Sequence, residues 1–187
     1  MSCELFPARL VLVVGPSGAG KDTLMARAAA ALAGEARIRF PRRVVTRVAD
    51  AAEVHDSLGT AEFAAAVAAG RFALHWQAHG LAYGIPAAAI SGGGVAVCNV
   101  SRAVIAQARA QFAGTQVVCV TAPREIRAAR LAGRGREAGQ ADAILARLER
   151  EVAGDAEKGA ELVIDNSGSV EAGAACLARF LAGLVQR

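Results

Sequence analysis

One stretch near the start of the chain constrains its fold more than any other. The run Arg9–Val14 is apolar after its first residue and rich in β-branched side chains, which is typical of a strand buried on both faces of a sheet. Glycines then punctuate Gly15–Gly20, and Lys21–Leu32 has the alanine-rich composition of a helix. The order strand, turn, helix predicts the first unit of a parallel α/β sheet.

The same alternation recurs along the rest of the chain. Three further apolar runs are predicted to be buried strands, and a helical segment follows each of them. Pro123 stands where a helix can begin, because a missing N–H costs nothing at the first helical position. The predicted strands are Val95–Val100, Val117–Thr121 and Leu162–Ile164, and the helices after them are Ser101–Phe112, Pro123–Leu131 and Ser169–Val185. We therefore expect a three-layer α/β/α fold with a mainly parallel sheet.

Two insertions interrupt this pattern. Residues from about Arg37 to Ile90 carry short strands, one helix near Thr60–Ala69 and most of the aromatic residues, while Gly133–Gln140 is rich in glycine and arginine. A chain of 187 residues supports one well-packed domain rather than two. The sequence predicts a single domain whose core comprises residues 1–36, 95–132 and 141–187, with an inserted lobe at about 37–90 and a short lid at about 133–140.

The glycine-rich turn matches the phosphate-binding P-loop pattern except in its last residue, Asp22. Glycines allow successive backbone N–H groups to surround phosphate oxygens, and the following helix adds the positive end of its dipole. Lys21 would reach the β- and γ-phosphates of ATP. A purely structural turn is the alternative, but the position between a strand and a helix favours function. The predicted nucleotide-binding residues here are Gly15, Pro16, Ser17, Gly18, Ala19, Gly20, Lys21, Asp22 and Thr23.

Asp22 occupies the position where a serine or threonine hydroxyl normally holds Mg²⁺. The loop is then either degenerate, or the Asp22 carboxylate itself serves the metal, which prefers oxygen ligands. The second interpretation has support at Asn99, because this strand usually supplies an acidic residue for Mg²⁺ and here supplies an amide. We expect Asp22 to be the metal-side carboxylate, with Thr23 as a hydroxyl one residue further on.

Arginine dominates the basic residues: of 21, only Lys21 and Lys158 are lysines. The planar guanidinium matches phosphate oxygens, which favours an anionic ligand, although GC-rich codons would give the same bias. A net charge of +4 and 4% aromatic residues argue against nucleic-acid binding. No apolar stretch approaches the length of a membrane span.

The cysteines Cys3, Cys98, Cys119 and Cys176 show no paired spacing. This indicates reduced thiols rather than a disulfide framework or a metal site. The first apolar run, Leu10–Val14, is too short for the core of a signal peptide. We expect a cytoplasmic protein without a membrane anchor.

Several segments together resemble the guanylate kinases. These are Gly15–Lys21, Val44–Arg47, Gly80–Gly84 and Arg130–Arg136, which occur in the order of the phosphate loop, acceptor-phosphate site, acceptor-lobe turn and lid of those enzymes. The variants are more similar to a related family, the ribose 1,5-bisphosphate phosphokinases, which form 5-phospho-α-D-ribose 1-diphosphate with ATP. The residues that carry this closer resemblance are Lys21-Asp22, His75-Trp-Gln-Ala-His-Gly80 before Tyr83-Gly84, and Asn99-Val-Ser-Arg102.

The resemblance implies a phosphorylated sugar as acceptor rather than GMP. The guanine-reading groups of guanylate kinases align near Gln77, Ile85 and Asn99, and none of these supplies the carboxylate or hydroxyl that guanine requires. A site without those partners discriminates strongly against a buried polar base. The predicted acceptor contacts are Arg43, Arg47, His75, Gln77, His79, Tyr83, Asn99 and Arg102, although surface or packing roles suit the two histidines equally well. Arg147, at helical distance downstream of the lid arginines, could join them at the substrate.

The implied reaction needs no catalytic base, because the acceptor phosphate is ionised near neutral pH, with a second pKa of about 6. Catalysis would rest on positioning and charge neutralisation by Lys21, Mg²⁺ and arginines of the lid. Arg127, Arg130 and Arg134 are spaced to share a helix face, for which a solvated basic surface is the alternative. The predicted catalytic residues are Lys21, Arg130, Arg134 and Arg136, and the family positions place Asp165 and Asn166 on the adenine side.

Two other functions stay open from the sequence. One is another small-molecule or nucleoside monophosphate kinase, including guanylate kinase itself. The other is a catalytically silent nucleotide-binding module, which the missing strand acid favours and the intact Lys21 disfavours. The sequence does not indicate an oligomeric state.

Overall fold

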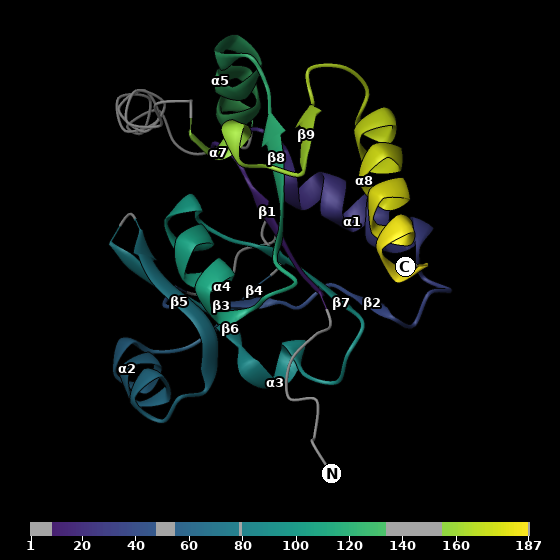
Figure 1. Ribbon diagram of the computed structural model, residues 1–187. Helices are drawn as coiled ribbons and strands as arrows, with labels where there is room; N and C mark the ends of the chain where they lie inside the picture. The colour runs from purple at the N-terminus through teal and green to yellow at the C-terminus, as the bar shows by residue number, and fades with distance from the viewer. Residues whose placement is uncertain (1–8, 48–54, 79, 134–154, 187) are drawn as a thin grey trace.

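The computed structural model describes residues 9–47, 55–78, 80–133 and 155–186. Its centre is a five-stranded parallel sheet in the order β2-β7-β1-β8-β9 (Figure 1). The strands are β1 Arg9–Val14, β2 Ile38–Arg39, β7 Val95–Asn99, β8 Gln116–Thr121 and β9 Leu162–Asp165. The four strands expected from apolar runs are therefore confirmed, and β2 is an addition.

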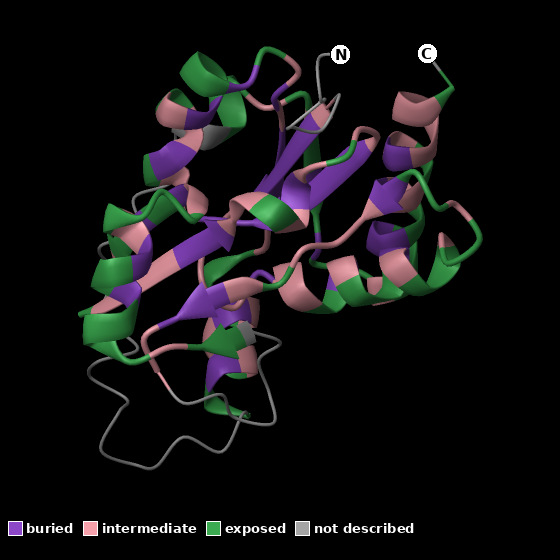
Figure 2. Cartoon of the chain, turned by 90° about the horizontal axis from the view of Figure 1, so that it is seen from below, coloured by how far each residue is buried: buried purple, intermediate pink, exposed green. Residues whose placement is uncertain are grey.

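Helices and a second sheet cover the two faces of this central sheet. On one face, Val11 and Val13 of β1 pack with Leu24 and Leu177 of two helices that lie against each other. On the other face, Leu10 and neighbouring residues pack against a further helix and the second sheet. Figure 2 shows the buried strands at the centre and exposed surface along the outer sides of the helices. The helices are α1 Lys21–Ala31, α4 Ile105–Gln111, α5 Arg124–Ala132, α7 Asp155–Lys158 and α8 Val170–Val185, with a 3₁₀ turn η1 at Arg102–Val104.

The helix ends follow the local sequence closely. Ser169 caps α8, its side chain accepting a hydrogen bond from the backbone N–H of Ala172 at 3.1 Å. Pro123 is extended (ψ 147°) and caps α5 instead of opening it, so that helix begins one residue later than expected. The segment after β7 starts as the 3₁₀ turn and then becomes α4. The α/β fold with a mainly parallel sheet is confirmed.

The inserted residues form a second, four-stranded sheet in the order β4-β3-β6-β5. Its first strand starts at Arg43, later than the expected lobe boundary near residue 37, because Ile38 of β2 is buried and pairs with Val95 in the central sheet. Of the expected lid, only Gly133 lies within the described residues. The elements are β3 Arg43–Val45, β4 His55–Ser57, α2 Thr60–Ala68, β5 Phe72–Ala78, β6 Leu81–Pro86 and α3 Ala87–Ile90.

The three described cysteines are free thiols, as expected. Burial raises the pKa of Cys98 to about 12, so this thiol stays protonated. Burial also raises the pKa of Cys119, with the nearby charge of Glu157 adding to the effect and those of Arg102 and Lys21 opposing it. In the part of the chain that is described, every helix is too short or too polar to cross a bilayer.

Candidate active site

The phosphate loop, residues Gly15–Gly20, turns between β1 and α1 in a conformation that requires glycine. The backbone angle φ is +140° at Gly15 and +92° at Gly20, values that L-residues with a side chain rarely adopt. Lys21 folds back over this loop, and its Nζ donates hydrogen bonds to the carbonyl oxygens of Gly15 at 2.7 Å and Pro16 at 3.0 Å. The ammonium group is thus held at the N-terminus of α1, which favours a bound anion.

Two side chains support the phosphate loop from behind. Asn166 is 1% exposed, and its Nδ2 donates to the carbonyl oxygen of Ala19 at 2.7 Å. Arg130 of α5 donates from Nη2 to the backbone oxygen of Asn166 at 2.8 Å, and its Nη1 lies 3.4 Å from the carbonyl oxygens of Gly18 and Ala19. The loop is therefore tied to the end of β9 and to α5, which fixes its shape before any ligand binds.

These contacts change the interpretation of Asn166. A role on the adenine side was expected, but its side-chain amide is buried against the loop backbone and its Oδ1 has no hydrogen-bond partner there. Its role in this structure is to support the loop. Asp165 is exposed, and its Oδ1 accepts a hydrogen bond from the backbone N–H of Ser167 at 2.9 Å. For Asp165 the adenine-side role stays a prediction.

The expected row of lid arginines is divided by the structure. Arg127 is 8% exposed, and its Nε donates to the carbonyl oxygen of Ala122 at 3.2 Å, so it belongs to the packing of α5 rather than to an open helix face. Arg130 reaches the phosphate loop from the same helix, as described above. The remaining lid arginine positions Arg134 and Arg136, and Arg147 downstream, lie outside the described residues.

Asp22 connects the start of α1 to two strands. Its Oδ1 accepts a hydrogen bond from Nδ2 of Asn99, at the end of β7, at 2.6 Å. Its Oδ2 lies 3.8 Å from Nη2 of Arg43, at the start of β3. Asn99 and Asp22, which the sequence analysis linked through a displaced carboxylate, are thus direct neighbours. Thr23 is exposed on α1.

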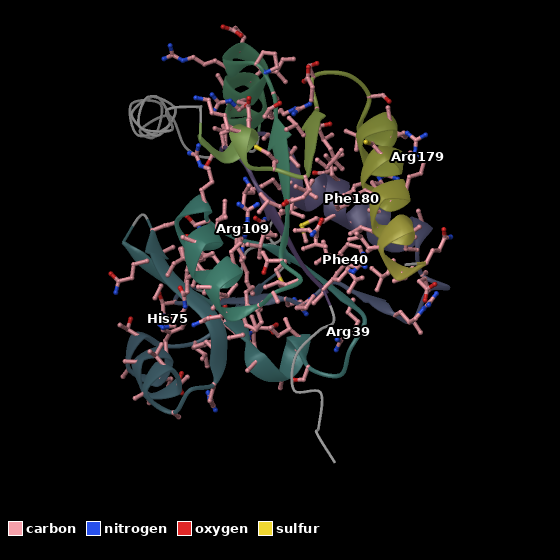
Figure 3. The ribbon with its side chains drawn as sticks, viewed as in Figure 1. Arg39, Phe40, His75, Arg109, Arg179 and Phe180 are labelled. Atoms are coloured by element: carbon pink, nitrogen blue, oxygen red, sulfur yellow. The ribbon has the colours of Figure 1, made fainter. Side chains whose placement is uncertain are left out.

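A pocket of about 210 Å³ opens beside this contact, and we call it the Asp22 pocket. Charged and polar residues line it together with apolar residues of α1 and with Phe40, which Figure 3 labels. The apolar part of this lining was not expected from the sequence, where its only signal is Phe40-Pro41 directly before the arginines. The lining residues are Asp22, Met25, Ala26, Ala29, Phe40, Pro41, Arg42, Arg43 and Asn99.

The β5–β6 hairpin separates residues that were expected to act together. Trp76 and Tyr83 are cross-strand neighbours and their rings stack at 5.4 Å on the side of the second sheet that packs against the core. His75 and Gln77 are exposed and alternate with Trp76 along β5, so they lie on the opposite side of the sheet. His75 is labelled in Figure 3. Successive residues of a strand point in opposite directions. An acceptor bound on one face of this sheet therefore cannot contact both Tyr83 and His75. His79 lies outside the described residues.

Two more expected site residues are partly buried near the edges of the sheets. Arg47 follows β3, and its backbone oxygen accepts a hydrogen bond from Oγ of Ser57 at 2.7 Å. Arg102 begins η1 directly after β7. Lys21 follows β1 and the phosphate loop, so both cations come after the carboxyl ends of strands in the central sheet. Ligands of parallel sheets bind at this edge.

Comparisons with known proteins identify relatives of this chain. No family model matches the chain. A ribose 1,5-bisphosphate phosphokinase PhnN of Methylobacterium radiotolerans is 51% identical over 178 residues, which are 94% of this chain and 98% of the relative. The protein of the same name from Brucella melitensis is 51% identical over 166 residues, 87% of this chain and 85% of the relative.

A solved structure shows the same fold. The guanylate kinase from Anaplasma phagocytophilum superposes with a TM-score of 0.64 at 18% identity, covering 95% of this chain and 86% of the other. At that identity the likeness shows the fold alone. The resemblance found from the sequence motifs is confirmed by the identities with the curated relatives, and the chain belongs to the ribose 1,5-bisphosphate phosphokinase family.

Proposed function

We propose that this protein transfers the γ-phosphoryl group of ATP to a phosphate of ribose 1,5-bisphosphate, giving 5-phospho-α-D-ribose 1-diphosphate and ADP. The family supports this reaction through the names of the relatives. The observation that carries it is the shared position of Asp22, which belongs both to the helix that follows the phosphate loop and to a pocket that contains Arg43. A nucleotide phosphate site and an arginine-containing pocket thus adjoin at one residue.

The chemistry follows from the charges of the site. An oxygen of the 1-phosphate attacks the γ-phosphorus, a new P–O bond forms, and the bond between the γ-phosphorus and the bridging oxygen of ADP breaks. The attacking oxygen is already ionised near neutral pH, because a phosphate monoester has a second pKa of about 6. No side chain has to remove a proton. Lys21, held over the loop, supplies positive charge at the phosphates, and Arg130 keeps the loop in shape.

The residues present fit a Mg²⁺ ion that arrives with ATP. Among the described residues no group of three or more histidine, cysteine, aspartate and glutamate side chains could hold a metal. A Mg²⁺ ion in a kinase needs fewer protein ligands, because it keeps several waters and binds one or two carboxylates beside the substrate phosphates. Asp22 is such a carboxylate, next to Lys21, and of the roughly four acceptor directions of a carboxylate the Asn99 amide takes one. Mg²⁺ would neutralise the charge that develops on the transferred phosphoryl group.

The structure also supports the prediction that guanine is a poor ligand. Ile85, the position expected to face a guanine oxygen, is fully buried and pairs with Leu74 across the β5–β6 hairpin. Gln77 lies on the other side of that sheet. A base edge placed against Leu74 and Ile85 would lose its hydrogen bonds to water and gain none.

The acceptor preference is testable with the purified protein. ATP consumption is measured with ribose 1,5-bisphosphate, GMP, AMP and gluconate as acceptors, and the phosphorylated product is identified by mass. We expect kcat/KM for ribose 1,5-bisphosphate to exceed that for GMP by at least about 10²-fold, because the guanine partners are missing. Robust phosphorylation of GMP with none of the bisphosphate would restore the guanylate kinase assignment. Inactivity with all four would favour a silent nucleotide-binding module.

Arg130 provides a second test. We expect Arg130→Ala to lower kcat by about 10- to 10²-fold while ATP affinity changes less, because the guanidinium shapes the loop and acts fully only when the site closes. Rates at saturating substrates and calorimetric binding of ATP separate the two effects. Arg124→Ala, on the exposed start of the same helix, is the control and should leave both unchanged. A loss of ATP affinity alone would assign Arg130 to ground-state binding.

A further inference from the structure

Asp22 is held firmly on one side and faces a cation on the other. Its hydrogen bond from Asn99 spans 2.6 Å, and the amide that donates it is only 8% exposed. A hydrogen bond to a charged acceptor is short and strong, so the carboxylate has little freedom to rotate. Its second oxygen consequently occupies a defined place, 3.8 Å from Arg43.

The fixed carboxylate oxygen of Asp22 can orient the guanidinium of Arg43. The side chain of Arg43 is 15% exposed, whereas that of Asp22 is 40% exposed, so the guanidinium lies at the buried end of the pair and the carboxylate at the open end. A largely buried guanidinium needs anionic or polar partners that fix its plane. Both groups line the Asp22 pocket, so the orientation of Arg43 determines what the pocket offers to a ligand phosphate.

We infer that Asp22 is a positioning residue for the acceptor: fixed by Asn99, its carboxylate orients the Arg43 guanidinium toward an acceptor phosphate in the Asp22 pocket. This inference rests on the proposed function for the identity of the acceptor. It adds a role to Asp22 that differs from that of a metal ligand. It also links the acceptor pocket to Lys21 at the start of α1, because Asp22 directly follows that lysine.

The direction in which Asp22→Asn changes the KM for the acceptor distinguishes a positioning role from simple charge repulsion. Asp22→Asn removes a negative charge beside the pocket, so electrostatics alone predicts a lower KM for the anionic acceptor. If Asp22 orients Arg43, the same substitution raises that KM, because the guanidinium loses the carboxylate that orients it. We expect a rise of about 10-fold at saturating ATP and Mg²⁺, the size usual for one charge-assisted contact. An unchanged or lower KM would overturn the inference.

A double-mutant cycle tests whether Asp22 acts through Arg43. The change in acceptor KM is measured for Asp22→Asn, for Arg43→Ala and for both together. We expect Asp22→Asn to have no further effect once Arg43 is gone, since no guanidinium is left to orient. Fold-changes that multiply in the double variant would mean that the two residues act independently, which contradicts the proposal.

Asp56→Asn is the matched control. Asp56 of β4 also pairs with an arginine, Arg42 directly before β3, at 3.4 Å, but both side chains are 56% exposed. The substitution makes the same change in charge, and Arg42, the partner of Asp56, also lines the Asp22 pocket. It should leave the acceptor KM within about twofold, because exposed ion pairs fix little.

A direct measurement of Arg43 makes the test independent of the acceptor. The Nε–H signal of Arg43 is observed by NMR in protein labelled with ¹⁵N-arginine and assigned with Arg43→Lys. We expect this signal to shift and broaden in Asp22→Asn and to stay unchanged in Asp56→Asn. An unaltered signal in Asp22→Asn would refute the positioning role. Failure of the wild-type protein to phosphorylate ribose 1,5-bisphosphate would instead refute the proposed function and leave this result standing.

Discussion

Lys21→Ala is expected to reduce kcat by about 10²- to 10³-fold, the loss typical of one preorganised positive group aimed at developing charge. In the structure the ammonium group already lies over the loop, within 3.0 Å of two carbonyl oxygens. No large rearrangement is needed to place it beside the phosphates. ATP affinity should fall less than kcat, because the charge it meets is greatest in the transition state.

The chain contains its own control for this substitution. Lys158, the only other lysine, is exposed at the end of α7, and Lys158→Ala removes the same charge without touching the loop. We expect Lys158→Ala to turn over at the wild-type rate. Thermal unfolding of both variants should stay within a few degrees of wild type, since neither lysine is part of the apolar core. Near-normal turnover of Lys21→Ala with ribose 1,5-bisphosphate would remove the loop from the mechanism.

The central sheet was predictable because its signals are local. Strands such as β1 are continuous apolar runs, and a helix follows each of them, so period and length are sufficient. The phosphate loop was predictable for the same reason, since its glycines and Lys21 are adjacent in sequence. β2 was missed because a pair of residues, Ile38–Arg39, carries no periodicity at all.

The sequence did not predict which side of the β5–β6 hairpin each expected site residue occupies. Alternation along β5 places His75 and Gln77 together, but the side on which Tyr83 lies depends on the register across the turn. That register pairs Tyr83 with Trp76, so the tyrosine joins the core side. The sequence analysis listed Tyr83 with His75 and Gln77 as acceptor contacts, and the register places Tyr83 on the opposite face of the sheet from those two residues.

Polar contacts between distant segments were the hardest to anticipate. The sequence suggested that Asp22 supplies the carboxylate that the strand lacks at Asn99. In the structure, Nδ2 of Asn99 lies 2.6 Å from Oδ1 of Asp22. The sequence did not indicate that Arg43 would lie beside the same carboxylate. Asn166 could equally contact a ligand or the backbone, and only its burial distinguishes the two roles. Such assignments depend on tertiary placement rather than on residue type.

The second large effect is a loss of stability on substitution of Gly15 in the phosphate loop. Alanine variants of Gly15 and of two glycines outside the loop separate its two causes. Gly15 combines φ of +140° with a backbone approach so close that a Cβ would collide with the carbonyl oxygen of Val120. Gly70 has φ of +66° but open space around it, and Gly34 has neither constraint. The series therefore separates strain of the backbone from collision with a neighbour.

We expect Gly15→Ala to lower the free energy of unfolding by about 3 kcal/mol or more, because a strained φ costs roughly 1–3 kcal/mol before any collision is counted. Gly70→Ala should cost about 1 kcal/mol and Gly34→Ala less than about 0.5 kcal/mol. For a chain of this size the Gly15→Ala loss corresponds to a melting temperature roughly 6–12 °C lower. Urea unfolding gives the free energies. Equal losses at Gly15 and Gly70 would show that the close approach of β8 to the phosphate loop does not constrain it, and the loop would then owe its shape to φ alone.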